Sequence, residues 1–242
     1  DFQPDPVPAL AGEIATLSEG AFKALDDLTV LGRSRRTSKF SAAGRELCRA
    51  GLIDDPGALT ETGEWVATHL RNGRHMAVAA DSSPPQLLTL WIGDMTVLAI
   101  SHLTDTATGR ITHRIVHCLT DDIPRLVFMW LELQPSWDMT FEITCSQAEF
   151  IAKLQTGAPP GTVPDGDAAE FTRRRWVAVS LIGPDNEKDA PEVAWAMARP
   201  RGVALLTEGT NADRVIVSRN PAEPFWQVLT RALLNLAEGE EP

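Results

Sequence analysis

The sequence predicts an α+β fold, with an antiparallel sheet built from two related four-strand meanders and flanked by helical bundles. Apolar residues recur with a helical period through the first third of the chain and change to a period of two at Met76. Four strands followed by a helix then occur twice, over 76–133 and 176–236. The free edges and apolar faces of two such meanders favour pairing into one larger sheet with pseudo-two-fold symmetry.

The composition is that of an ordinary globular protein. Of 242 residues, 43% are hydrophobic and 23% are charged, and length alone allows one large domain or two small ones. We expect a single domain over 1–242, with a first half at 1–136 and a second half at 137–242. The longest strongly apolar run, at 126–131, is far short of the ~20 residues that span a bilayer.

The net charge and the cysteines indicate which partners and which cellular compartment to expect. The net charge of −11 repels a phosphate backbone unless basic residues are segregated into a patch. Cys48, Cys118 and Cys145 are widely spaced and match neither a disulfide framework nor a zinc pattern. No charged-then-apolar leader opens the chain. We therefore expect a cytosolic protein.

The first third is predicted to be three helices. The first covers 8–28, with a possible break at Gly20. The second begins after Ser41, a natural N-cap. The third starts at Thr60 with acidic residues in its first turn and ends at Gly73, as dipole and C-cap preferences favour.

Two meanders follow. The first has strands at 76–81, 87–92, 95–103 and 111–119, with Gly93-Asp94 as a hairpin turn, and then a helix that opens with Asp121, Asp122 and Pro124. A helix with the capping box Ser146–Glu149 precedes the second meander. Its strands are predicted at 176–182, 192–198, 202–208 and 213–219, before a final helix with Asn220 as cap, Pro221 at its first position and Glu223 as capping-box partner. Side-chain identities do not repeat, but each half reads as helix, four strands, helix.

No common catalytic motif is present. G-x-S-x-G, H-E-x-x-H, a phosphate loop and G-x-G-x-x-G are all missing from the sequence. His113 and His117 lie on a predicted strand, ~13 Å apart with Ile115 between them, too far to share one metal ion. The paired carboxylates at 26–27, 54–55 and 121–122 fit helix ends and turns, and Cys48 fits a buried thiol. We expect no catalytic residue, no metal and no cofactor.

Residues 51–65, GLIDDPGALTETGEW, are typical of the end of a winged-helix DNA-binding domain. The basic stretch at 32–39 and the arginines Arg45 and Arg49 support that interpretation. The would-be wing, DDPGA, has two acidic residues where a wing meets phosphates, and the next helix adds two more. A winged-helix regulator remains the alternative, and an enzyme with dispersed residues comes third.

End to end, the order of segments resembles the EspG family, cytosolic chaperones of actinobacterial type VII (ESX) secretion. The residues that carry the resemblance are AFKAL (21–25), RAGLIDDPGAL (49–59) and MTFEITCSQAEFIAKL (139–154), within a match from about Ala21 to Leu236. The resemblance implies a sheet of two related halves and, as partner, a PE–PPE heterodimer held soluble before export. The chain departs from the family at 31–40, which lacks the usual proline-rich segment, and in its long turn-rich linker at 155–169.

A chaperone of this kind needs an apolar surface rimmed by polar groups. Val193, Trp195 and Met197 alternate onto one face of a predicted strand, and Phe225 and Val228 belong to an apolar stripe of the final helix. The same patterns also describe core residues. We predict a non-catalytic cytosolic chaperone that binds a secreted helical PE–PPE-type heterodimer, without nucleic acid or membrane insertion.

Overall fold

The computed structural model confirms an α+β protein with an antiparallel sheet. Its elements belong to two compact units, a first of residues 5–77 and 86–130 and a second of residues 1–4, 78–85 and 131–242. The structure describes residues 12–31, 37–38, 40–81, 85–105, 107–132, 141–160, 166–183, 193–198, 202–208, 213–219, 227 and 229–235.

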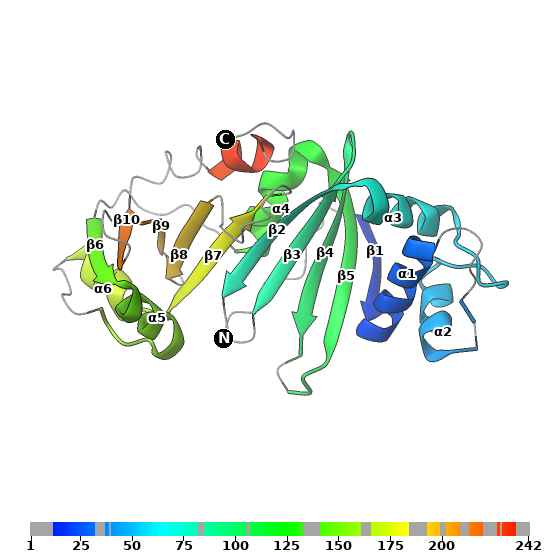
Figure 1. The fold of residues 1–242 in the computed structure, drawn as a ribbon, viewed down its shortest axis with the longest axis horizontal. Coiled ribbons are helices and arrows are strands. Elements are labelled where there is room, and N and C mark those ends of the chain that lie inside the picture. The colour runs from blue at the N-terminus through cyan, green and yellow to red at the C-terminus, as the bar shows by residue number, and fades with distance from the viewer. Residues whose placement is uncertain are drawn as a thin grey trace. The chain divides into compact units, whose positions relative to one another are not determined.

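The chain up to Trp130 contains the first meander as predicted. Its strands are ordered β1-β5-β4-β3-β2, so that β2 to β5 are neighbours in sequence order and β1 adds an edge strand next to β5 (Figure 1). The elements are β1 (Gly12–Ser18), α1 (Glu19–Leu31), α2 (Ala42–Arg49), α3 (Glu61–Asn72), β2 (Arg74–Asp81), β3 (Gln86–Ile92), β4 (Thr96–Thr104), β5 (Ile111–Leu119), the 3-10 turn η1 (Thr120–Asp122) and α4 (Ile123–Trp130).

The opening helix was predicted to start too early. Residues 12–18 are a strand, and the helix begins at Glu19 and passes through Gly20 without a break. Ala15 and Leu17 are buried while Thr16 between them is exposed, which is a period of two. The spacing of Ile14, Leu17 and Ala21 also fits one helical face, because the strand runs directly into the helix and shares its buried side.

The next two helices begin as predicted. The Ser41 hydroxyl accepts a hydrogen bond from the Gly44 amide (2.9 Å), and the Thr60 hydroxyl accepts one from the Gly63 amide (3.1 Å). Between these helices, Ile53 and Leu59 form an isolated antiparallel bridge around the turn that carries the two acidic residues. The side chain of Asp54 accepts from the Ala58 amide (2.8 Å), so this carboxylate stabilises the turn.

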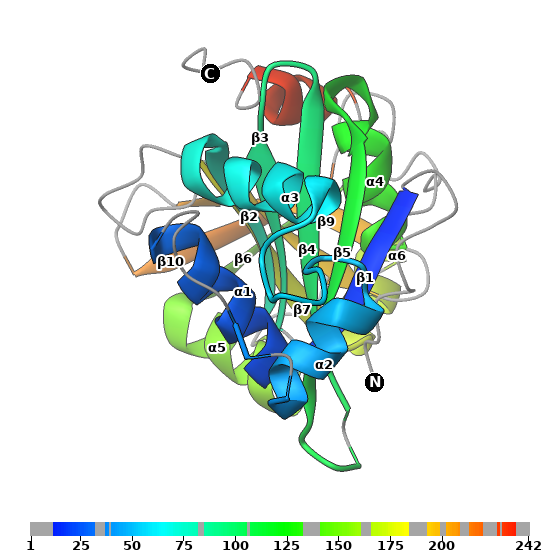
Figure 2. The ribbon, with the colours of Figure 1, turned by 90° about the vertical axis from the view of Figure 1, so that its right-hand side faces the viewer.

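The first three helices cover one face of the first unit's strands (Figure 2). Leu25, Leu47 and Val66 of these helices belong to one buried cluster with Ile100 of β4 and Ile115 of β5. The apolar sides of α1, α2 and α3 are therefore used to pack against the sheet.

The second meander is also confirmed, with strand order β7-β8-β9-β10-β6. Helix α6 was not predicted; it lies where the sequence suggested a turn-rich linker. The capping box of Ser146 and Glu149 is present as predicted, whereas Asn220, Pro221 and Glu223 lie outside the described residues. The elements are β6 (Phe141–Ser146), α5 (Gln147–Thr156), α6 (Asp167–Arg173), β7 (Trp176–Ile182), β8 (Val193–Ala198), β9 (Gly202–Glu208) and β10 (Arg214–Arg219), and residues 227 and 229–235 are helical.

Both halves start with the same junction of strand and helix. β1 pairs with β5 and β6 pairs with β10, each antiparallel, and each outer strand runs straight into a helix. At both junctions a serine hydroxyl, that of Ser18 or Ser146, accepts from an amide in the helix's first turn. The repeat is thus strand, helices, four strands, with the outer strand added to the predicted pattern.

Candidate functional site

The predicted binding residues of β8 lie inside the protein. The side chain of Trp195 is 0% exposed and that of Met197 is 4% exposed, and they are paired with Val179 and Val177 of β7. The alternative interpretation of the pattern, core packing, describes both. Val193 begins β8, and Phe225 and Val228 lie outside the described residues.

The predicted histidine pair lies on a strand, as expected, but its members differ in environment. His117 is exposed, while His113 is 4% exposed and stacks on the ring of Phe22 with 4.3 Å between ring centroids. His102 of β4 meets the His113 ring edge-on at 4.6 Å. Within the described residues neither ring nitrogen of His113 has a hydrogen-bond partner. Burial, with a smaller contribution from His102, lowers the His113 pKa to about 4, so this ring is neutral at pH 7.

Another histidine has a structural role. His69 of α3 donates from Nδ1 to the Trp65 carbonyl (3.0 Å), because a carbonyl oxygen can only accept. Its Nε2 then accepts from the Thr96 hydroxyl (3.0 Å) at the start of β4. This pair of bonds fixes α3 to the β3–β4 hairpin.

Two of the three cysteine thiols are buried. Burial raises the pKa of Cys118 to about 12 and also raises that of Cys145, which keeps both as neutral thiols. Among the residues described, no group of three or more histidine, cysteine, aspartate or glutamate side chains is placed to hold a metal ion. None of the helices described combines the length and apolar character of a membrane span.

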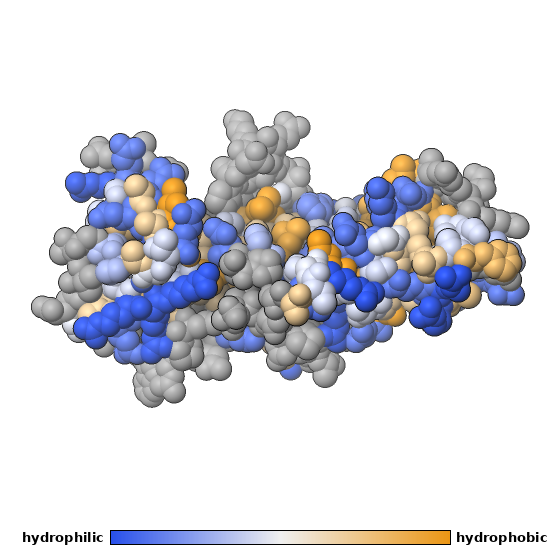
Figure 3. Space-filling model, turned by 90° about the horizontal axis from the view of Figure 1, so that it is seen from below, coloured by the Kyte–Doolittle hydropathy of each residue, from blue (hydrophilic) through white to orange (hydrophobic). Residues whose placement is uncertain are grey.

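Two residues with exposed apolar side chains, Met95 and Leu119, lie where the backbones of the β3–β4 turn and the end of β5 meet, and we call them the hairpin patch. Met95, in the β3–β4 turn, is 75% exposed, and Leu119, the last residue of β5, is 56% exposed. The Thr120 amide donates to the Met95 carbonyl (3.2 Å), and Leu119 pairs with Thr96. On the face drawn in Figure 3, hydrophobic residues form several small groups separated by hydrophilic ones.

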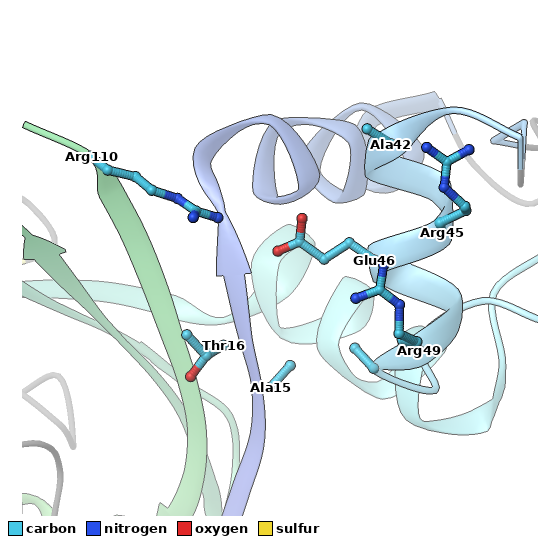
Figure 4. A pocket seen from close by; sticks show the side chains of 8 residues that line it. Ala15, Thr16, Ala42, Arg45, Glu46, Arg49 and Arg110 are labelled. Atoms are coloured by element: carbon cyan, nitrogen blue, oxygen red, sulfur yellow. The ribbon is translucent and has the colours of Figure 1, made fainter. Parts of the chain in front are cut away.

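A pocket of about 540 Å³ lies between β1 and α2. Figure 4 shows the side chains of Arg49 and Arg110 entering it from opposite sides, with Glu46 between them. Arg45 lies at the outer side of α2 and donates to the Phe40 carbonyl. The lining residues are Ala15, Thr16, Ala42, Arg45, Glu46, Arg49, Ala50 and Arg110.

The single acidic side chain of this pocket is already engaged. One carboxylate oxygen of Glu46 accepts from the Ser18 amide (2.6 Å) and the other from the Ser18 hydroxyl (2.7 Å). In the described part of the chain, Arg49 and Arg110 form no salt bridge, although the charge of Arg110 helps to lower the pKa of nearby Asp105. The pocket therefore holds two guanidinium groups that form no salt bridge among the described residues, with the Glu46 carboxylate between them (Figure 4).

Two of the arginines that line this pocket belong to the stretch that resembles a DNA-binding helix. Arg45 and Arg49 were noted as basic residues of a would-be DNA-binding helix, and their spacing places them on one helical face. Arg110 comes from the far end of the β4–β5 hairpin, and no spacing in the sequence connects it with α2. No protein-family model matches the chain, and no curated protein gives a significant match.

Proposed function

We propose that this protein is a non-catalytic cytosolic chaperone of the EspG type, which binds a secreted helical PE–PPE-type heterodimer before type VII secretion. The hairpin patch carries the proposal. A helical client kept soluble before export has an apolar tip to cover, and covering it takes exposed apolar side chains on a firm support. Met95 and Leu119 meet that need, and methionine adapts its shape to different partners.

The support beneath the patch is rigid. The Gly93 amide donates to the Thr96 carbonyl (2.9 Å) and closes the hairpin turn, while His69 holds the same hairpin to α3. A side chain presented from such a turn loses little conformational entropy when a partner binds. A sheet of two related halves, which the EspG resemblance implies, also supports the proposal.

A pair of charge substitutions tests the patch. Met95→Asp combined with Leu119→Asp places two carboxylates where an apolar tip would be covered, and we expect binding to a purified PE–PPE heterodimer from the same organism to weaken about tenfold or more. Isothermal titration calorimetry measures the affinity. The matched control is Val30→Asp, because Val30 on α1 is 74% exposed, as Met95 is at 75%.

The possible outcomes test the chaperone function and the position of the binding surface separately. If the unmodified protein binds no PE–PPE heterodimer of its organism, the chaperone proposal fails. If the double variant binds as tightly as the Val30→Asp control, the client is held elsewhere and the hairpin patch is the wrong surface.

A further inference from the structure

β1 is an edge strand of the sheet in the part of the chain that the structure describes. Along a strand, successive residues direct their backbone amide and carbonyl to opposite sides. The Ser18 amide points outward, since it donates to Glu46 of α2. Thr16, two residues earlier, therefore presents its amide and carbonyl to the same free edge, beside the pocket that it lines.

The pocket next to this edge selects for negative charge. Arg49 on α2 and Arg110 at the start of β5 both point into it, and both lack a salt-bridge partner within the described residues. Glu46 uses its two oxygens on Ser18 and so closes one end of the groove. Thr16 is therefore the residue of β1 with which an added strand can pair.

The geometry points to this groove, between β1 and α2, as a docking site for an acidic protein segment in extended conformation, added to the sheet next to β1. The backbone of the segment pairs with Thr16, and every second side chain faces α2, where a carboxylate meets Arg49 or Arg110. Backbone pairing supplies affinity, and the two guanidinium groups select acidic side chains.

Nucleic acid fits the groove less well than an acidic peptide. The carboxylate of Glu46 lies inside the groove, and Glu13, which pairs with Arg114 (2.8 Å), adds a second on the exposed side of β1. A nucleic-acid strand carries a phosphate at every nucleotide and would bring some of them against both carboxylates, whereas an extended peptide can place its acidic side chains at the arginines. A nucleic-acid backbone also cannot extend the hydrogen-bond ladder of a strand.

This inference does not depend on the chaperone proposal, and its test contains no PE–PPE protein. The probe is a fluorescein-labelled heptapeptide in which glutamate alternates with valine, measured by fluorescence polarisation with the full chain. We expect saturable binding that weakens as salt is added. The double variant Arg49→Glu with Arg110→Glu should weaken it about tenfold or more.

Two controls make the test specific. Arg125→Glu changes an exposed arginine of α4 that does not line the groove, and its combination with Arg214→Glu on β10 matches the double variant in net charge. The same peptide with N-methylated alternate amides keeps its charges but cannot pair as a strand. We also expect the bound heptapeptide to slow hydrogen exchange at the Thr16 amide and to leave the Ser18 amide unchanged.

Three results would overturn the inference. The first is the absence of saturable binding of the heptapeptide to the unmodified chain. The second is equal binding of the N-methylated peptide, or an equal loss in the Arg125→Glu/Arg214→Glu control, since either would mean a general charge effect. The third is tighter binding of a single-stranded oligonucleotide of equal charge, which would make the arginines a nucleic-acid site.

Discussion

Lys153 of α5 is the most deeply buried charged side chain of the described residues, with 0% exposure. Its ammonium group donates to the carbonyl of Gly157 (3.0 Å), at the end of its own helix, and to the carbonyl of Thr172 in α6. It also lies 5.5 Å from the ring centroid of Trp176. Two hydrogen bonds and one cation–π contact thus join the ends of two helices to β7.

Replacing this lysine should be costly. Lys153→Ala leaves two carbonyl groups without their donor and opens a cavity, and we expect it to lower the free energy of unfolding by about 3 kcal/mol. Urea denaturation measures the difference. Lys23→Ala on α1 is the control, and a change within about 0.5 kcal/mol is expected there because Lys23 is exposed. A Lys153 variant as stable as the Lys23 variant would refute this role.

The buried ring of His113 makes stability depend on pH. Its pKa is about 4 in the folded protein and has an ordinary value of 6.5, so the unfolded chain binds the proton more readily between these values. Stability is therefore lost as pH falls from about 6.5 toward 4, by on the order of 2 kcal/mol from this group. His113→Phe keeps the stacking on Phe22 and removes the titration.

Urea unfolding measures the stability of both proteins at about pH 7 and at about pH 4.5. Most of the pH range in which His113 should affect stability lies between these two conditions. The unmodified protein should lose more stability than His113→Phe between the two conditions, because carboxylates contribute equally to both. Equal losses would show that the His113 ring does not carry the effect.

At the scale of elements, one glycine explains the TETG that opens α3. A Cβ at Gly63 would lie 2.0 Å from the backbone oxygen of Leu52, which also accepts from the Thr60 amide (3.0 Å). Only a glycine lets α3 approach the chain this closely. The residues that make 51–65 resemble a winged helix thus serve here to pack α3 closely against the chain at Leu52.

Gly63→Ala should therefore destabilise the protein by about 2–4 kcal/mol, since the obstructing atom is backbone and cannot rotate away. The matched change is Gly20→Ala in α1, where no atom lies within 4 Å of the added methyl group. It should stabilise by about 0.5–1 kcal/mol through helix propensity. The urea midpoints of the two variants should move in opposite directions, and a parallel shift would contradict this account of α3.

The same serine–glutamate hydrogen bonds occur at both junctions of strand and helix, although the two sequences differ there. Ser18 and Ser146 occupy the same position, and in each case a glutamate binds both the amide and the hydroxyl of the serine. The second half uses Glu149 of the same helix, whereas the first half uses Glu46 of α2, 28 residues away. A local capping box is readable from spacing, and its long-range counterpart is not.

Across the whole molecule, short-range patterns predicted most elements but missed β1 and the pocket beside it. The strands of the two meanders are short β-rich runs bounded by turn residues, such as Gly93-Asp94, and neighbours along the chain are enough to predict such runs. β1 was assigned to a helix because Ile14 and Leu17 satisfy both periods. The groove of Arg49 and Arg110 depends on β1 lying beside α2, and only the tertiary structure brings those elements together.

The measurement that tests the central claim most directly is size-exclusion chromatography with light scattering of the full chain mixed with a PE–PPE heterodimer from its organism. The proposal predicts a single stoichiometric complex that persists at moderate salt, because apolar contact rather than charge holds it. Separate elution of chain and heterodimer, together with salt-sensitive retention of the chain on heparin, would contradict the chaperone account and favour the DNA-binding alternative.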